Sequence, residues 1–362
     1  MFKNLLKIFF LFLIIFVIFI SYLSIFGIKT NNFNEFIKSQ VVKQDSRINI
    51  DLQDVYIKLN IKEGSVSLNT RDINVFINNE NQKLSNVDLL IGFKSLIKRE
   101  NKIKKIIINS QVNNINNLLK FIRAYKINIP ALYLENIITK GNIVYNITIN
   151  NHNNDNNKIK ISGKIIETYL NILGKEKINN INFNFDYNNG NLNIINLGVE
   201  YKNLNFVSKQ ISSNFNTDIV QINGDFKNKI NLNLISSLID FNFKDYLNNK
   251  ILLSSKSKFS ISLNKKFKIK DYKLESEINF DSLKVNLDNI DLKKILKNFE
   301  KKFILKNGKI NLFLNRNNEI KFKVDSKYVL NDKEEPQEIK LKYSKINSEE
   351  KYILNINLSE HE

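Results

Sequence analysis

Apolar and polar residues alternate with a period of two through most of this 362-residue chain. The alternation begins at Ile48, Ile50 and Leu52 and shifts by one residue before Val55. Because successive side chains of a strand point to opposite faces, this pattern predicts strands with one apolar face and one polar face. It recurs in residues 143–149, 159–161, 181–187, 230–234, 259–263, 310–314, 320–324, 339–343 and 353–358. We therefore expect a mostly β protein of about twenty strands.

Turn-forming residues separate these segments, for example Asn188-Asn189-Gly190. Six glycines stand before a polar and then an apolar residue, and we interpret each as a turn residue that precedes a new strand. They are Gly64, Gly141, Gly163, Gly190, Gly224 and Gly308. Helical spacing interrupts the alternation in residues 116–125, 234–239 and 292–303, where we expect short helices.

The region after residue 46 contains no linker rich in Pro, Gly or Ser. A single curved antiparallel sheet of repeated hairpins fits this continuity, with its apolar side forming an elongated groove. Two packed β-sandwiches in series are the alternative. Ten apolar residues on one face of the predicted strands are our candidates for lining the groove: Val55, Ile57, Leu59, Ile143, Tyr145, Ile147, Ile149, Ile181, Phe183 and Phe185.

Composition excludes several classes of site. The chain has no Cys, which excludes disulfides, thiolate zinc sites and cysteine nucleophiles. Its two histidines, His152 and His361, lie in an Asn-rich segment and next to the chain end, where we expect solvated side chains. We find no phosphate-binding loop, dinucleotide fingerprint or EF-hand loop. The sequence therefore predicts a protein that is not an enzyme and needs no cofactor or metal.

The start of the chain predicts a membrane anchor. Every residue in an uninterrupted run is apolar: Ile8, Phe9, Phe10, Leu11, Phe12, Leu13, Ile14, Ile15, Phe16, Val17, Ile18, Phe19 and Ile20. As a helix, residues 5–26 would measure about 33 Å, enough to cross a hydrocarbon layer of ~30 Å. Lys3 and Lys7 precede the run, which favours a cytoplasmic N-terminus. A cleaved signal peptide is the alternative, but the bulky Tyr22 and Phe26 crowd the possible cleavage site.

These observations predict three regions: an anchor at 1–28, a polar linker at 29–46 and a β-rich domain at 47–362. Lys and Arg number 55 against 36 Asp and Glu, for a net charge of +19. Nucleic-acid binding would require exposed aromatic residues among the lysines, whereas the aromatics here fall mostly on the apolar face of strands. We expect membrane lipids and no nucleic acid as partners, with the lysines either attracting anionic headgroups or forming a solvated face.

The N-terminal third resembles the opening of the AsmA-like envelope protein family. The resemblance rests on the apolar helix, the paired strands and the segment LLIGFKSLIKRENKIKKIIINSQVNNINNLLKF, residues 89–121. In that segment a Leu/Ile-rich element and a turn precede a strand at residues 103–108. A short helix with the paired leucines Leu118 and Leu119 follows. Beyond about residue 125 the resemblance is limited to a succession of short predicted strands in which apolar and polar residues alternate.

The resemblance implies a lipid transporter of Gram-negative bacteria. Such a protein would be held in the inner membrane, with its bulk in the periplasm, and would shield phospholipid acyl chains in a β-groove on their way to the outer membrane. Two other functions stay open. The chain would otherwise act as a scaffold in outer-membrane protein assembly, together with other envelope proteins, or as a component of a lipopolysaccharide bridge.

Overall fold

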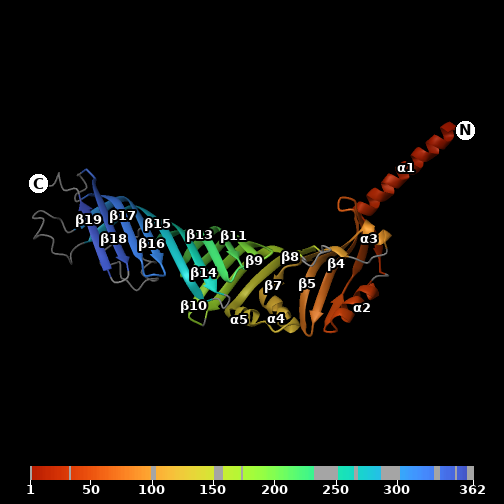
Figure 1. Ribbon diagram of the computed structural model, residues 1–362, viewed down its shortest axis with the longest axis horizontal. Helices are drawn as coiled ribbons and strands as arrows, with labels where there is room; N and C mark the ends of the chain where they lie inside the picture. The colour runs from red at the N-terminus through yellow and green to blue at the C-terminus, as the bar shows by residue number, and fades with distance from the viewer. Residues whose placement is uncertain are drawn as a thin grey trace, which may run out of the picture. The chain divides into compact units, whose positions relative to one another are not determined.

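The computed structural model describes residues 2–31, 34–98, 103–150, 158–172, 174–231, 252–264, 268–286, 302–329, 335–346 and 349–356 (Figure 1). The chain divides into two compact units. The N-terminal unit comprises residues 1–175 and 185–189, and the C-terminal unit comprises residues 176–184 and 190–362. Each unit is described here by itself.

The N-terminal unit contains all the helices of the described chain and the first strands. The helices are α1 (Phe2–Ile25), α2 (Asn34–Gln44), α3 (Phe93–Ile97), α4 (Ile115–Tyr125) and α5 (Ile129–Ile137). The strands are β1 (Ile28–Thr30), β2 (Ile48–Asp51), β3 (Asp54–Asn60), β4 (Ser65–Ile77), β5 (Glu80–Gly92), β6 (Ile103–Ser110), β7 (Asn113–Asn114), β8 (Ile138–Asn150) and β9 (Lys158–Ile172).

Strand β10 (Glu176–Asn188) contributes residues to both units, and the strands that follow it belong to the C-terminal unit. They are β11 (Asn191–Tyr201), β12 (Leu204–Asn214), β13 (Ile219–Asn231), β14 (Leu252–Asn264), β15 (Ile269–Asn286), β16 (Lys302–Asn315), β17 (Ile320–Val329), β18 (Gln337–Ile346) and β19 (Glu349–Ile356).

The strands form one antiparallel sheet of 19 strands, which confirms the prediction of a mostly β protein with a single antiparallel sheet. In the N-terminal unit, β3 pairs with β1 and β4, and the sheet continues through β5, β6, β8 and β9. In the C-terminal unit, each strand from β11 to β18 pairs with the next strand in sequence. Short connections and alternating faces therefore account for the architecture.

Among the described residues, three apolar clusters form the cores. In the N-terminal unit, one contains Ile50 and Leu84 and packs against α2, and a second lies beneath α4 and α5. In the C-terminal unit, Leu204, Leu253 and Phe280 form the third cluster on one face of the sheet. The described helices pack on strands β2 to β9, and the described part of the C-terminal unit consists of strands and their connections.

One predicted helix is confirmed and two fall outside the described residues. Residues 116–125 form α4, whose N-terminus is capped by the Asn114 side chain accepting a hydrogen bond from the Asn116 amide at 2.8 Å. The predicted helix at 234–239 lies outside the described residues, as does most of the one at 292–303, whose last two residues begin β16.

Sequence reasoning missed α2, α3 and α5. The segment predicted as a linker contains β1 and α2, because Ile37 and Val41 lie one helical turn apart and pack on the core of β2 to β5. Helix α5 starts beside Pro130, a residue that suits the first turn of a helix, and Asn128 caps it.

The glycine prediction is only partly right. Gly64 and Gly190 have positive φ and immediately precede β4 and β11, as expected. The other four glycines, Gly141, Gly163, Gly224 and Gly308, lie inside β8, β9, β13 and β16 and are not turn residues. At the last three of these, a phenylalanine ring occupies the space that a Cβ would need: Phe185 at Gly163, Phe259 at Gly224 and Phe280 at Gly308. The missing side chain makes room for an aromatic ring on the apolar face.

Helix α1 carries exposed apolar side chains, from Phe9 at 59% exposed to Phe19 at 52%. Met1 and the side chains of Phe2–Leu6 and of Ile8 lie outside the described residues. A search of the described part of the chain for a helix with the length and apolarity of a membrane span finds none.

Candidate functional site

The strand register of the N-terminal unit places most of the predicted groove residues on one face. Residues that lie directly opposite each other in neighbouring strands point to the same side of a sheet. Apolar residues follow one another in this way across seven strands: Ile28, Ile57, Leu68, Leu89, Ile106, Ile149 and Ile159. The row beside it contains Val55, Thr70, Val87, Ile108, Ile147 and Ile161, and Leu59 begins a shorter row on the same face.

Part of this face is covered by helices. Ile143 belongs to the core cluster beneath α4 and α5, and Tyr145 and Phe185 pack against the same cluster. Burial raises the pKa of the Tyr145 hydroxyl above its ordinary value. These three predicted residues therefore contribute to a packed core. Of the other five in this unit, Val55 is buried, and Ile57, Leu59, Ile147 and Ile149 are half-buried.

The remaining two predicted residues lie on β10 in the C-terminal unit, where Ile181 is buried and Phe183 is half-buried. The same unit has an apolar face of its own, built from rows that cross β13 to β19. One row contains Phe226, Ser257, Ser276, Leu312, Phe322, Tyr343 and Tyr352. The next contains Asn228, Ser255, Ile278, Ile310, Val324, Leu341 and Leu354.

Burial on this apolar face falls towards the end of the chain. Phe280 on β15 is 3% exposed, whereas Tyr352 and Leu354 on β19 are 67% and 55% exposed. The rings of Phe206, Phe226 and Phe259 pack in series across β12, β13 and β14, the first pair T-shaped and the second tilted, with successive centroids 5.9 and 6.2 Å apart. The face therefore passes from a packed aromatic core to open apolar strands within one unit.

Four polar residues interrupt the apolar rows without leaving unpaired groups. The Ser257 and Ser276 hydroxyls lie 2.6 Å apart across β14 and β15, and Ser255 donates a hydrogen bond to the Asn228 side chain. Because each buried hydroxyl has a partner, these residues are compatible with an otherwise apolar surface.

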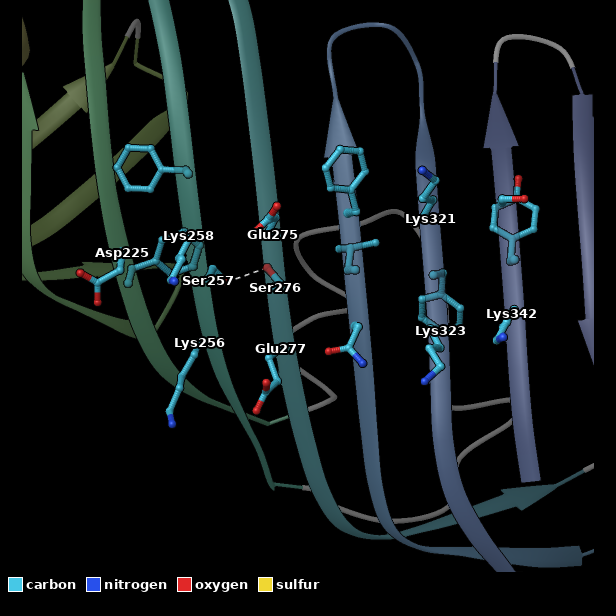
Figure 2. Close-up of a pocket in the computed structure, with 18 of the residues that line it drawn as sticks. Asp225, Lys256, Ser257, Lys258, Glu275, Ser276, Glu277, Lys321, Lys323 and Lys342 are labelled. Atoms are coloured by element: carbon cyan, nitrogen blue, oxygen red, sulfur yellow. Dashed lines mark hydrogen bonds between the residues drawn. The ribbon is translucent and has the colours of Figure 1, made fainter. Parts of the chain in front are cut away.

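An open cavity of about 1210 Å³ runs along the sheet of the C-terminal unit from β13 to β19 (Figure 2). Its lining includes Phe226, Phe259, Leu312, Phe322 and Tyr343 of the apolar face, together with residues of two adjoining rows of the polar face that we call the lysine rows. One row contains Asp225, Lys258, Glu275, Phe313, Lys321, Ser344 and Lys351. The other contains Lys227, Lys256, Glu277, Asn311, Lys323, Lys342 and Ile353. The two lysine rows together hold seven lysines and three acidic residues.

Two of the three acidic residues of the lysine rows pair with lysines outside those rows. Lys273 binds Glu275 and Lys309 binds Glu277, each with an N–O distance of 2.7 Å. The hydrogen bond from Lys273 lowers the pKa of the Glu275 carboxyl, and the hydrogen bond from Lys309 does the same for Glu277. The positive charges of Lys273 and Lys309 therefore offset the charges of these two glutamates.

The lysine rows were not predicted from the sequence. A signal for them exists, because Lys256 and Lys258 stand two residues apart, as do Lys321 and Lys323. Residues with this spacing share one face of a strand. The register that aligns the two pairs in common rows depends on the connections between strands, which the pattern of lysines does not specify.

Comparison with protein-family models finds no match, and no curated protein or solved structure matches the chain. The resemblance to AsmA-like envelope proteins therefore stays a prediction. The surface that the geometry offers for function is the apolar face of the sheet, which in the C-terminal unit borders the open cavity.

Proposed function

We propose that this protein is anchored in the inner membrane and shields lipid acyl chains on the apolar face of its sheet, contributing to phospholipid transport between the inner and outer membranes. The observation that carries the proposal is the extent of the apolar rows, which cross seven neighbouring strands in the N-terminal unit and the strands β15 to β19 in the C-terminal unit. Soluble domains ordinarily bury such a face under a second layer. Here the described helices pack on β2 to β9 only.

The energetics favour acyl chains as the occupant. Each methylene group removed from water contributes ~0.8 kcal/mol, so a chain of ~16 carbons gains roughly 12 kcal/mol on an apolar surface. Neighbouring strands lie ~4.8 Å apart and repeat the same apolar side chains, so an acyl chain meets a similar environment at each step across the sheet. Movement along the rows then requires no catalytic group.

Helix α1 is the proposed anchor. Its apolar side chains between Phe9 and Phe19 are 43–69% exposed, and a membrane would cover them. Lys7 lies on the N-terminal side of this stretch, which favours a cytoplasmic N-terminus and a periplasmic sheet.

Site-specific photo-crosslinking in living cells tests the proposal. A photoreactive phenylalanine analogue replaces Phe322 in one variant and the adjacent Lys323 in the other. Because adjacent strand residues face opposite sides of the sheet, the second variant is a matched control. We expect phospholipid adducts at position 322 and far fewer at position 323. Equal labelling at both positions, or no lipid adduct at 322 in a folded and membrane-bound protein, contradicts the proposal.

Strand β19 favours one second candidate, a scaffold for envelope protein assembly. Every residue of β19 is exposed, including Tyr352 and Leu354, and β18 pairs with it along its whole length. An exposed strand at the end of a sheet is a template for pairing with an extended peptide. Protein adducts in place of lipid adducts in the crosslinking experiment would support this function.

A further inference from the structure

We propose that one edge of the N-terminal unit docks on the surface of the membrane that holds α1, against anionic phospholipid headgroups. This docking edge consists of the end of β3 with the turn to β4, helix α3 and the start of β6, residues 58–65, 92–98 and 103–105. The inference rests on the proposed function, because it requires α1 to be a membrane anchor. It adds a second membrane contact, made by the sheet itself, which an anchor alone does not imply.

Helix α1 ends at the docking edge. Strand β1 follows α1 directly and pairs with β3 in antiparallel register, so Ile28 lies opposite Ile57 near the end of β3. A Cβ at Gly27 would lie 2.7 Å from both the Ile57 carbonyl oxygen and Lys58 Cγ, so the chain lies against β3 at this point. The exposed apolar side chains of α1 continue to Phe26, one residue before this contact. A bilayer that covers them would therefore have its surface within about 10 Å of the β3–β4 turn, because three strand residues span ~3.3 Å each.

The docking edge exposes apolar side chains on two adjoining segments. Ile97 on α3 is 82% exposed, and Leu96 beside it and Ile61 in the β3–β4 turn are exposed as well. The two segments are joined, because the Phe93 amide donates a hydrogen bond to the Gly64 carbonyl at 3.1 Å. Single exposed apolar residues are ordinary, whereas several on adjoining segments indicate a surface that is covered in use. Segments that lie on a membrane bury such side chains at the boundary between headgroups and acyl chains.

The charge of the docking edge is complementary to anionic headgroups. It contains one acidic residue, Glu63, against six lysines: Lys58, Lys62, Lys94, Lys98, Lys104 and Lys105. Glu63 pairs with the two lysines at the start of β6, with N–O distances of 3.1 and 3.3 Å. Lys62, Lys94 and Lys98 are exposed and form no ion pair with another described residue. Anionic phospholipids attract lysines held this close to a membrane surface, which favours a membrane over a protein as the occupant.

Docking would also bring the apolar face of the sheet to the membrane. The apolar row nearest the docking edge consists of residues that lie opposite one another on β3, β4, β5 and β6: Leu59, Val66, Ile91 and Ile103. Its first and last members belong to the docking edge itself. An acyl chain that leaves the bilayer here meets apolar side chains at once.

Fluorescence quenching in lipid vesicles tests the inference. The chain contains no Cys, so a single introduced cysteine can carry a nitrobenzoxadiazole label on the full-length protein. The label is attached through Ile97→Cys and, as a control, through Ile127→Cys in the α4–α5 connection, where the side chain is 92% exposed. That connection lies at the opposite end of the strands (Figure 1), because α4 follows Ser110, which pairs near the start of β5, whereas α3 follows the end of β5.

The vesicles contain phosphatidylcholine and phosphatidylglycerol, with nitroxide-labelled lipids as quenchers. We expect quenching at position 97 to be at least about threefold stronger than at position 127, because the 13 residues of β5 span roughly 40 Å. Equal quenching at the two positions would overturn the inference. A label at 97 that is shielded from water but not quenched would overturn it too, since a protein would then cover the edge.

A third label separates failure of the inference from failure of the proposed anchor. Attached through Phe16→Cys, it reports whether α1 is inserted in the bilayer. Quenching at position 16 without quenching at position 97 would overturn the docking edge alone. Absence of quenching at position 16 would overturn the anchor and, with it, the docking edge.

Paired charge variants test the role of the lysines. With the label at position 97, Lys94→Gln/Lys98→Gln should lower the quenching by about half or more. The control Lys120→Gln/Lys126→Gln removes the same charge from exposed positions at the opposite end of the strands, beyond the ~8 Å range of unscreened charges, and should change the quenching by less than about a tenth. An equal loss in both pairs would mean general electrostatic attraction and would overturn the inference. Far-UV circular dichroism of each variant verifies the fold.

Discussion

The substitution Gly308→Ala tests whether the strand glycines exist to seat aromatic rings. A Cβ at position 308 would overlap the Cζ, Cε1 and Cε2 atoms of Phe280, which lies directly opposite on β15. Phe280 is 3% exposed and packs with Leu204 and Leu253, which are 1% and 5% exposed. The ring therefore has no vacant space nearby, and the strands must move apart or the ring must leave the core.

Either response lowers the free energy of unfolding. Overpacking of a well-packed core costs typically 1–3 kcal/mol, and exposing a buried phenylalanine costs roughly 1.5–3 kcal/mol. We expect Gly308→Ala to lower the free energy of unfolding by about 2–3 kcal/mol. For a unit of this size that loss corresponds to a fall in Tm of roughly 4–12 °C. Urea unfolding followed by far-UV circular dichroism measures the change from the shift in midpoint.

A control and a rescue make the result decisive. Gly198 lies inside β11, has no heavy atom within 4 Å of an added Cβ and does not have positive φ. Gly198→Ala should therefore be neutral or stabilise by up to about 1 kcal/mol. The double variant Gly308→Ala/Phe280→Leu replaces the ring by a smaller side chain. It should recover part of the lost free energy of unfolding, because substitutions at two residues in contact are coupled. A stable Gly308→Ala, or equal destabilisation at positions 198 and 308, would refute the role of the aromatic rings.

Two further predictions concern the N-terminal unit. Hydrogen bonds from Arg47 lower the pKa of Asp45 to about 2, and Arg47 also donates to the Tyr125 carbonyl at 3.0 Å. Because the pKa of Asp45 is lowered on folding, its contribution is present above the ordinary value of 3.8 and is lost as the pH falls through about 2. The difference in urea midpoint between the wild type and Asp45→Asn should accordingly be largest near neutral pH and vanish at the acid end; a difference that does not change with pH would contradict this. Leu119→Ala should cost about 2–4 kcal/mol, because Leu119 is 7% exposed in the core beneath α4 and α5. Ile122→Ala on the same helix, where the side chain is 36% exposed, should cost under about 1 kcal/mol, and equal costs in thermal unfolding would argue against a packed core there.

The alternation of residues was sufficient to predict the sheet, because a period of two is a local property of a strand. Ile57 and Ile149 were assigned to apolar faces from their immediate neighbours alone, and the register places them in one row. Helix α4 was predicted from a local signal too, since Leu118, Leu119 and Ile122 lie on one helical face. Secondary structure was therefore predicted correctly where the spacing of apolar residues within one segment was sufficient to identify it.

The alignment of the lysine rows and the roles of the glycines were not predictable in this way. Gly308 has the same local sequence pattern as Gly64, yet only Gly64 lies at a turn with positive φ. What distinguishes Gly308 is Phe280 on the neighbouring strand, a contact that depends on register. Lys258 and Lys321 likewise lie in one row only because the register of β14, β15, β16 and β17 aligns them. Both arrangements depend on which residues of neighbouring strands lie opposite each other, and the local pattern of one sequence does not specify that register.

The pairing of successive strands from β11 to β19 has a consequence for how the C-terminal unit folds. Each new strand finds its partner in the strand just completed, so most contacts are local in sequence and loop closure costs little entropy. The unit can therefore fold by stepwise addition of strands as the polypeptide emerges, without waiting for a distant segment. A chain interrupted after β16 should still contain the paired strands β11 to β16, whereas a sandwich with crossed connections would lose its core.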